Sequence, residues 1–300
     1  MSRIVAVCNQ KGGVGKTTSA VNLASELALA GLAILLVDLD PQANATSGLG
    51  IDKTKVASSI YPVLLEQKPV SSSIIKTQIK NLDMIPSQVS LSGAEVEMIG
   101  LPSRETRLKR ILEPVRSEYD LILIDAPPSL GLLTVNALAA ADAVLIPLQC
   151  EYYALEGLGQ LLETIQMVQK WLNPKLAIEG ILLTMADFRT KLTNDVIEEA
   201  KKFFSDKVYE VVIPRSIRLS EAPSHGLPIA LYDPDSSGAQ AYRQLAKIIK
   251  ERLNVGNERI RERNTSADPG SRTYSEPGDK HQDPPAVNPP QSLPASEGSG

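Results

Sequence analysis

The chain has 300 residues, of which 43% are hydrophobic and 4% aromatic, and its formal net charge is −4. This composition is typical of a globular protein with an aliphatic core, and the acidic balance excludes a wholly basic nucleic-acid binder, so any such contact needs a local patch. Cys8 and Cys150 lie in apolar runs, which indicates reduced thiols in a cytosolic protein rather than a disulfide framework. We find neither a secretory leader pattern nor an apolar stretch long enough to predict a membrane span.

A stretch rich in lysine and glycine, Lys11–Thr18, follows an apolar run at residues 4–8 and precedes a helical apolar pattern. Strand, glycine turn and helix in this order are typical of a phosphate-binding loop. The usual spacing is met at Gly15–Thr17, but the first glycine of the pattern is replaced and an extra lysine, Lys11, opens the stretch. The stretch therefore predicts a variant P-loop that binds a nucleoside triphosphate.

The chemistry of each position supports this prediction. Glycines let backbone N–H groups approach phosphate oxygens, and the N-terminus of the following helix favours the same anion. Lys16 is expected to reach the β- and γ-phosphates, and the Thr17 hydroxyl to bind Mg²⁺. The residues expected to bind nucleotide here are Lys11, Gly12, Gly13, Val14, Gly15, Lys16, Thr17 and Thr18.

The next elements are a helix ending near Ala30 and an apolar run, 34–37, that predicts a strand buried on both faces of a parallel sheet. This run ends in Asp38 and Asp40, and acidic residues at the carboxyl end of such a strand lie beside the ligand crevice of an α/β sheet. Residues 44–50 are predicted to form a mobile loop.

Residues 51–118 have a less regular pattern, which predicts short helices at 60–65 and 91–101 and a short strand at 82–86. Ser103 is a candidate N-cap for a further helix. The basic residues of that helix are interpreted as a solvated face rather than a binding surface: Arg104, Arg107, Lys109, Arg110 and Arg116.

Four apolar residues at 121–124 end in Asp125, which is the form of a Walker B strand. Such an aspartate supports Mg²⁺, often through water. A turn aspartate before prolines is the alternative, and the P-loop upstream favours the metal role. The remaining pattern predicts helices at 133–141, 151–168 and 194–204, strands at 143–147, 178–185 and 208–213, and a final helix to about 253.

Strand and helix alternate throughout, which predicts an α/β fold: a doubly wound, mostly parallel sheet flanked by helices, of the P-loop NTPase type and in a single domain. We assign residues 1–254 to this domain. Residues 255–300 are rich in Pro, Gly and Ser and poor in apolar anchors, which predicts a disordered tail.

These motifs resemble those of the ParA/Soj chromosome- or plasmid-partitioning ATPases, within the deviant Walker A group that also holds MinD. The matching segments are NQKGGVGKTTSAVNLA (9–24), LLVDLDPQANATSGLG (35–50), LILIDAPPSLGLLTVNAL (121–138), EYYALEGLGQL (151–161) and VIPRSIRLSEAPSHG (212–226). The resemblance covers the chain to about residue 253 and leaves only the tail unmatched.

The resemblance implies a homodimer in which two subunits enclose two ATP molecules with Mg²⁺. Lys11 would reach the partner's nucleotide, where a cation neutralises charge on the transferred phosphoryl group. Asp40 matches the family's catalytic aspartate, Asp38 lies nearer the metal shell with Asp125, and Pro214 with Ser216 matches the adenine-lining segment.

The resemblance also implies binding of non-specific DNA in the ATP state, with hydrolysis stimulated by a ParB-like (Spo0J) protein. Arg189 and Arg218 match DNA-contact positions, and other basic residues could join them: Lys191, Lys201, Lys202 and Arg215. For the lysines a solvated face is the competing interpretation, and for Arg218 it is an ion pair with Glu221.

Two alternatives remain. One is a MinD-like ATPase at a membrane surface, which the proline-rich tail argues against, since those relatives end in an amphipathic helix. The other is a metabolic or redox enzyme on the same scaffold; Cys8 inside the first strand does not suit a shared metal cluster. The early P-loop predicts that no helix-turn-helix domain precedes it, and we expect a cytoplasmic, nucleoid-associated protein.

Overall fold

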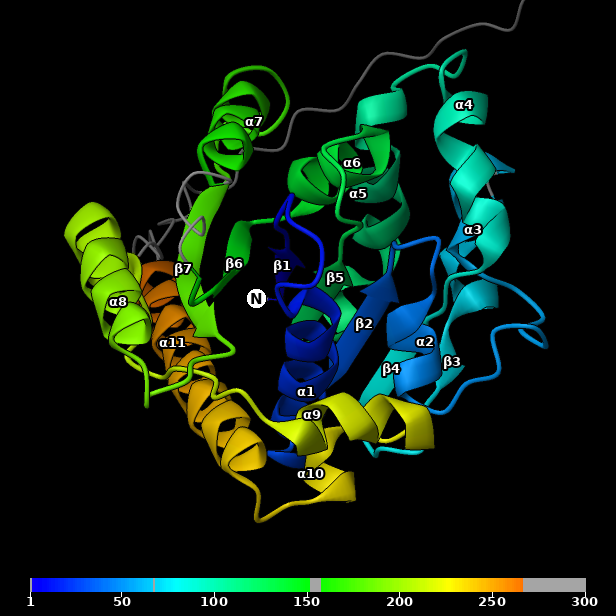
Figure 1. The fold of residues 1–300 in the computed structure, drawn as a ribbon. Coiled ribbons are helices and arrows are strands. Elements are labelled where there is room, and N and C mark those ends of the chain that lie inside the picture. The colour runs from blue at the N-terminus through cyan, green and yellow to red at the C-terminus, as the bar shows by residue number, and fades with distance from the viewer. Residues whose placement is uncertain (1, 67, 152–157, 267–300) are drawn as a thin grey trace, which may run out of the picture. The chain divides into compact units, whose positions relative to one another are not determined.

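The computed structural model describes residues 2–66, 68–151 and 158–266. Within these residues lies a seven-stranded sheet with the order β3-β4-β2-β5-β1-β6-β7 (Figure 1). All neighbouring strands are parallel except β3 and β4. The strands are β1 (Arg3–Val7), β2 (Ile34–Asp38), β3 (Ile75–Lys76), β4 (Leu82–Ile85), β5 (Leu121–Asp125), β6 (Ala143–Gln149) and β7 (Ala177–Thr184). The predicted doubly wound α/β fold is confirmed.

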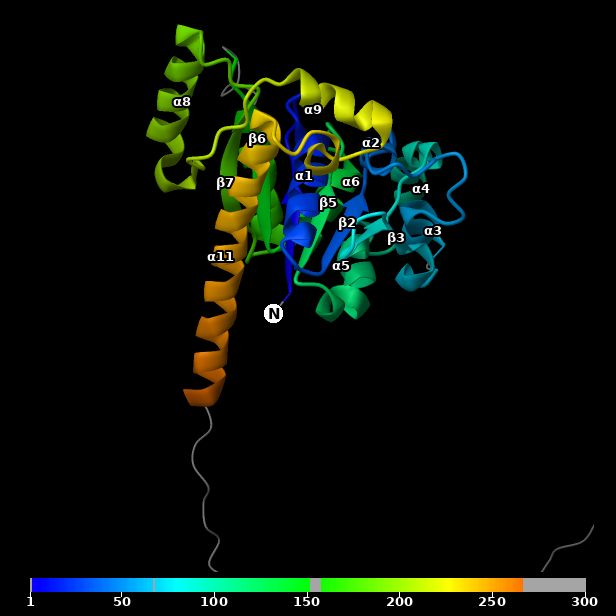
Figure 2. The ribbon, with the colours of Figure 1, turned by 90° about the horizontal axis from the view of Figure 1, so that it is seen from below.

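Helices cover both faces of this sheet (Figures 1 and 2). One apolar core packs α1 and α9–α11 against the sheet, and the other packs α3–α8 against the opposite face. The helices are α1 (Lys16–Leu29), α2 (Asn44–Gly48), α3 (Ile60–Leu65), α4 (Ala94–Met98), α5 (Arg107–Leu112), α6 (Leu132–Ala140), α7 (Leu158–Trp171), α8 (Lys191–Phe204), α9 (Ile217–Glu221), α10 (Ile229–Tyr232) and α11 (Ser237–Ser266).

The central strands are buried on both faces, as their continuous apolar runs predict. Every residue of β2 and β5 is buried, and along β1 Ile4 and Ala6 face one core while Val5 and Val7 face the other. Because β2, β5 and β1 are adjacent and parallel, their carboxyl ends meet at one edge of the sheet. This edge carries the residues that the sequence singles out.

Two local predictions are wrong. Residues 44–48 form helix α2 instead of a loop, since Thr46 is anchored to the buried carboxylate of Asp38 by its backbone N–H and its hydroxyl. Residues 208–213 form no continuous strand: their segment meets β7 in an isolated bridge between Ile181 and Val208. The Tyr209 ring packs against Gly180, where a Cβ would lie too close to it, and the segment bonds to β7 only at separate points, Tyr209 to Ile181 and Ile213 to Leu183.

The interpretation of the segment after Ser103 is wrong for Ser103 and Arg107, whereas Lys109 and Arg110 are exposed as expected. Ser103 has a positive φ of 51° and makes no side-chain cap, and Arg107 is only 2% exposed rather than part of a solvated face. The Arg107 guanidinium donates to the carbonyl of Leu64 at the end of α3, so it caps that helix. Burial and the charge of Arg110 lower the pKa of Arg107.

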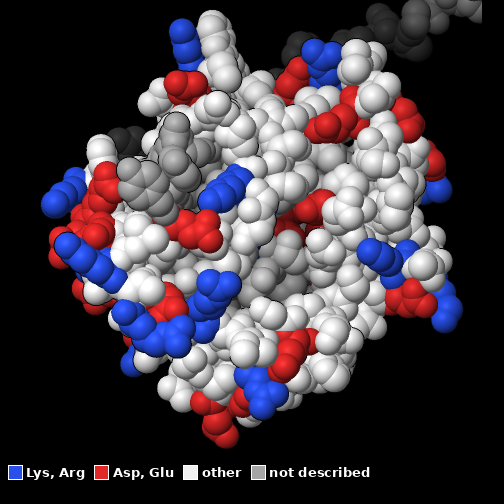
Figure 3. Space-filling view, viewed as in Figure 1, with Lys and Arg blue, Asp and Glu red and all other residues white. Residues whose placement is uncertain are grey.

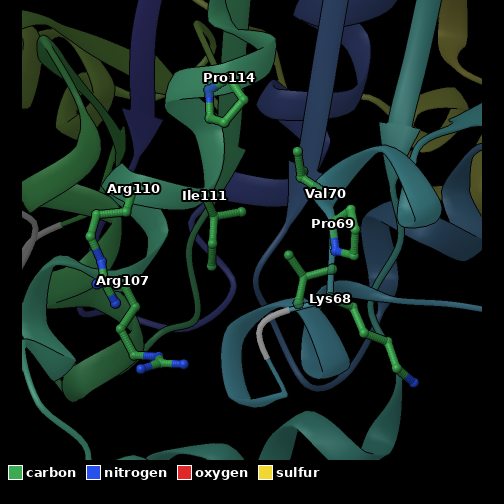
Figure 4. A pocket seen from close by; sticks show the side chains of 8 residues that line it. Lys68, Pro69, Val70, Arg107, Arg110, Ile111 and Pro114 are labelled. Carbon is green, nitrogen blue, oxygen red and sulfur yellow. The ribbon is translucent and has the colours of Figure 1, made fainter. Parts of the chain in front are cut away.

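Arg107 lines a cavity of about 280 Å³ between α3 and α5 (Figure 4). The cations around it do not converge on one point: Arg107 is engaged by carbonyls, and the Lys68 side chain extends away from Arg107 in Figure 4. The cavity therefore reads as a gap between packed helices and lies apart from the strand ends.

Helix α11 runs to Ser266, past residue 254 where we placed the end of the domain, and the compact unit extends to Arg259. The rest of the predicted tail, 267–300, lies outside the described residues, as do residues 152–157 of the predicted helix 151–168. Among the described helices, none combines the length and apolarity needed to cross a bilayer.

Candidate functional site

The P-loop connects β1 to α1 at the centre of the sheet edge. Gly13 and Gly15 have φ values of 75° and 84°, a left-handed conformation that glycine adopts without steric cost. Gly15 directly precedes α1, a helix of 14 residues whose N-terminus faces the loop. This conformation is the one that a phosphate-binding loop needs, and phosphate binding by its N–H groups and the helix N-terminus stays a prediction.

Lys16 lies folded over this loop. Its side chain is buried, and its Nζ donates to the Lys11 carbonyl oxygen at 3.0 Å. Burial lowers the pKa of Lys16, whereas the charges of Asp125 and Asp40 oppose that shift. The ammonium group is therefore held against a P-loop carbonyl near two carboxylates, where a triphosphate would offer it anionic partners.

Two buried carboxylates face the P-loop from adjacent strands. Asp38 and Asp125 are directly paired in the β2–β5 register, and both are fully buried. Neither carboxylate oxygen of Asp125 has a hydrogen-bond partner of acceptable geometry among the described residues. Burial, followed by the charge of Asp38, raises the pKa of Asp125 well above its usual value, and a contact with Thr17 and the charge of Lys16 act in the opposite direction.

Unpaired buried oxygens beside a P-loop threonine fit a hard cation. Mg²⁺ prefers oxygen ligands and is commonly bound through one or two carboxylates together with phosphate oxygens. Among the described residues no group of three or more His, Cys, Asp or Glu side chains could hold a metal alone. Asp125 and Thr17 therefore suit a Mg²⁺ ion that arrives with the nucleotide.

Asp38 differs from Asp125 because its oxygens are already engaged. It accepts hydrogen bonds from the backbone N–H groups of Asp40 and Thr46 and from the Thr46 hydroxyl. Burial raises the pKa of Asp38 to about 6 in spite of these bonds. Its predicted place near the metal shell stays a prediction, and the structure adds a second role as the anchor of α2.

Asp40 lies two residues beyond the end of β2 and is 7% exposed. Its Oδ1 accepts from the backbone N–H of Gln42 at 2.9 Å, which fixes the turn after the strand. Because the charge of Asp40 acts on Lys16, the two side chains belong to one electrostatic cluster. This placement suits a base that orients a water molecule at the γ-phosphate.

Lys11, the extra lysine, pairs within its own chain. Its Nζ lies 3.1 Å from Oε2 of Glu151, with side-chain exposures of 39% and 49%. Glu151 follows the carboxyl end of β6, next to β1 in the sheet, and Asn9 supports the lysine's backbone N–H at 3.0 Å. The amine of Lys11 is thus near the surface, whereas that of Lys16 is turned into the loop.

The predicted adenine-lining residues border a cavity of about 340 Å³ beside the P-loop. Pro214 and Ser216 form one wall, and Gly15 and Thr18 belong to another. The full lining is Gly15, Thr18, Thr184, Met185, Ile213, Pro214, Arg215, Ser216, Leu219, Ser220, Pro223 and Tyr242. A cavity of this size with polar and apolar walls, continuous with the P-loop, suits a nucleoside.

Both arginines predicted to contact DNA are exposed and already paired. Arg189 forms two hydrogen bonds to Asp187, and Arg218 lies 3.0 Å from Glu221. The segment bearing Arg189 adjoins Arg215 through the bridge between Ala186 and Pro214. In Figure 3, lysines and arginines gather at the left, where α8 lies in Figure 1, and they are interspersed with acidic groups.

A P-loop, a helix N-terminus, a buried strand-end carboxylate and an adjoining cavity together define a P-loop nucleotide-binding protein. A family model described as "AAA domain" matches residues 2–178. The chain is 61% identical over 249 residues to the sporulation initiation inhibitor protein Soj of Bacillus subtilis, covering 83% of this chain and 98% of the relative. It is 53% identical over 252 residues to the chromosome partitioning protein ParA of Myxococcus xanthus, covering 84% and 89%.

Among solved structures, a cobyrinic acid a,c-diamide synthase from Mycobacterium smegmatis with bound ADP and magnesium has a TM-score of 0.76 and 38% identity, covering 85% of this chain and 97% of that one. The chain belongs to the ParA/Soj family of chromosome-partitioning P-loop ATPases. The resemblance inferred from its motifs is therefore confirmed.

The sequence analysis missed three residues of this site. Thr46, within the predicted loop, anchors α2 to Asp38, and Glu151 holds Lys11. The Thr184 hydroxyl donates to the Val14 carbonyl, which supports the P-loop from β7. Thr46 and Glu151 lie in the segments that carry the family resemblance, and those segments could have drawn attention to them. No pattern in the sequence points to Thr184.

Proposed function

We propose that this protein is an ATP-dependent DNA-segregation ATPase. ATP with Mg²⁺ joins two copies of the chain face to face, the dimer binds DNA without sequence preference, and hydrolysis, stimulated by a ParB-like partner, releases it. The observation that carries the proposal is the P-loop with two lysines in different settings: Lys16 is buried over the loop and Lys11 is near the surface. We expect the protein in the cytoplasm, on the nucleoid.

The residues divide the work of hydrolysis. Backbone N–H groups of Gly12–Gly15 and the α1 N-terminus bind phosphate oxygens, and Lys16 supplies a positive charge in cis. Asp125 and Thr17 would hold Mg²⁺, which neutralises charge on the phosphates. Asp40 accepts a hydrogen bond from the attacking water and orients it. Pro214 and Ser216 hold the adenine of the nucleotide.

Lys11 is the residue proposed to act in trans. A cation that arrives from the partner subunit neutralises charge where it develops during phosphoryl transfer, and it makes assembly depend on the nucleotide. To do so, Lys11 exchanges the carboxylate of Glu151 for the partner's phosphates. Glu151 is thus a competitor that favours the separate subunits.

Glu151→Gln is expected to lower the ATP concentration at which half of the protein is dimeric by up to about fivefold, because an exposed ion pair is worth about 0.2–1 kcal/mol. Analytical ultracentrifugation across an ATP titration measures it. Glu163→Gln, an exposed carboxylate on α7, is the control and is expected to match wild type. A higher ATP requirement in Glu151→Gln would contradict the competition.

DNA binding is proposed for the region around Arg189 and Arg218. Both side chains are exposed, and their present partners, Asp187 and Glu221, are exchanged for phosphate oxygens when DNA binds. Such contacts release counterions, so the affinity should fall steeply with salt. The predicted supporting residues are solvent-exposed as well: Lys191, Lys201, Lys202 and Arg215.

The variant Arg189→Glu/Arg218→Glu is expected to form the ATP dimer yet to lose DNA binding in a low-salt electrophoretic shift assay. Lys80→Glu/Lys175→Glu is the matched control: it changes the net charge equally, but its lysines precede β4 and β7 and so lie at the opposite edge of the sheet. Undiminished DNA binding by the arginine variant would place the DNA surface elsewhere.

The competing functions have less support. A MinD-like membrane role needs an amphipathic terminal helix, and residues 254–266 of α11 contain only Val255 and Ile260 as large apolar residues. A small-molecule enzyme, as the name of the 38% identical structure suggests for that protein, is disfavoured by the 61% identity to Soj. Co-sedimentation with anionic vesicles distinguishes the membrane role from DNA binding.

A further inference from the structure

Two glycines, Gly50 and Gly226, bring the end of α2 against the segment that follows α9, the helix that carries Arg218. Gly50 follows α2 and Gly226 follows the 3₁₀ turn Ala222–His225, with φ values of 78° and 64°. A Cβ built on Gly226 would lie 2.6 Å from the Gly50 Cα, and a Cβ on Gly50 would lie 3.0 Å from the Gly226 carbonyl oxygen. The two backbones therefore touch at a point where no larger residue fits. We call this contact the Gly50–Gly226 joint.

On one side, this joint is rigidly tied to the nucleotide site. Asp38, at the end of β2, binds Thr46 of α2 through two hydrogen bonds of 2.8 and 2.7 Å, and both residues are fully buried. The N–H of Gly50 then bonds to the Ser47 carbonyl, which closes α2. A shift of the strand end by Mg²⁺ and phosphate would carry α2 and Gly50 with it.

On the other side, the joint adjoins the proposed DNA surface. The turn Ala222–His225 continues directly from α9, which bears Arg218. Arg218 is held by Glu221 at 3.0 Å and by Asp233 at 3.3 Å, and Tyr232 also donates to Glu221. Displacing this turn moves Glu221 and so changes how firmly the guanidinium is held back from a phosphate.

Two further bonds hold the segment in place, one from the connection between β3 and β4 and one from α1. The Gln78 side chain donates to the Gly226 carbonyl at 3.1 Å, and Asn22 of α1 accepts from the backbone N–H of Ile229 at 2.7 Å. Figures 1 and 2 both show α9 and the residues after it lying beside α2. The contact is thus continuous from α1 and α2 to α9.

We propose that the Gly50–Gly226 joint couples the nucleotide state to the DNA grip of Arg218 within a single subunit. This coupling acts in addition to dimerisation, which brings two DNA-binding surfaces together. The inference rests on the proposed DNA binding. By linkage, DNA must then raise ATP affinity by the same factor by which ATP raises DNA affinity.

The test compares Gly226→Ala with Gly31→Ala. Gly31 has a φ of 92°, but a Cβ there meets nothing within 4 Å, so both variants carry a left-handed alanine while only Gly226→Ala disturbs the joint. Dimerisation is measured by ultracentrifugation, and DNA affinity by fluorescence anisotropy in ATP and in ADP. Gln78→Ala, which removes one hydrogen bond and adds no strain, is the second variant.

We expect wild type and Gly31→Ala to bind DNA more tightly with ATP than with ADP by at least about tenfold, within the usual range of couplings between sites. Gly226→Ala should dimerise with ATP, but its ratio of DNA affinity in ATP to that in ADP should be at least about threefold smaller than that of wild type, and Gln78→Ala should fall between. An unchanged ATP/ADP ratio in both joint variants would overturn the inference. If wild-type protein shows no ATP-dependent DNA binding, the proposed function is overturned instead.

Discussion

Lys16→Ala is expected to abolish ATP binding at micromolar nucleotide. The lysine is the buried cation of the P-loop, and its charge-assisted bonds to phosphate are worth about 1.5–3 kcal/mol, which is at least about tenfold in affinity. The folded state should survive, because Asp125, which loses the neighbouring charge, already has a raised pKa and can bind a proton.

Fluorescent-nucleotide titration measures this affinity, and thermal unfolding without nucleotide checks the fold. Lys175→Ala, an exposed lysine before β7, is the control and should bind ATP as wild type does. If folded Lys16→Ala binds ATP with wild-type affinity, the P-loop is not the ATP-binding site.

Asp40→Ala is expected to bind ATP and dimerise but to hydrolyse about 10²–10⁴-fold more slowly, since a positioned general base contributes a factor of this order. The dimer should then persist on DNA, because release follows hydrolysis. Steady-state phosphate release and DNA anisotropy after ATP addition measure the two effects.

Asp40→Asn is the matched variant for this prediction. It keeps an oxygen that can accept from the Gln42 N–H, so the turn after β2 is preserved while the base is lost. Equal loss of turnover in both variants supports a chemical role for Asp40. Normal turnover in Asp40→Asn would show that Asp40 only stabilises the turn after β2 and takes no part in hydrolysis.

The order of the elements and the nucleotide site could be predicted because they rest on local patterns. Residues 34–38 and 121–125 are apolar runs ending in aspartate, and such runs are typical of central parallel strands. Adjacent parallel strands then bring Asp38, Asp125 and the P-loop to one edge without further information.

What could not be predicted depends on contacts distant in the sequence. Helix α2 exists because Asp38 binds Thr46, and its N-cap, Ala43, has a positive φ of 54° that no sequence signal gives to alanine. The burial of Arg107 follows from the carbonyl of Leu64, which lies 43 positions away. In both places tertiary partners outweigh local propensity.

The pairing of Lys11 with Glu151 and the meeting of Gly50 with Gly226 belong to the same class. Each joins segments more than a hundred residues apart, and a glycine in the sequence reports only backbone freedom, not what touches it. We propose that these contacts link nucleotide binding at the P-loop to the dimer surface and the DNA surface.

The most direct test of the central claim sets two ligands side by side. Wild-type protein with ATP, ADP or no nucleotide is incubated at low salt with a non-specific DNA duplex or with vesicles rich in phosphatidylglycerol, and bound protein is measured by co-sedimentation. We predict binding to DNA with ATP only, falling linearly with salt on logarithmic axes, and none to vesicles. ATP-dependent binding to vesicles with none to DNA would contradict the account.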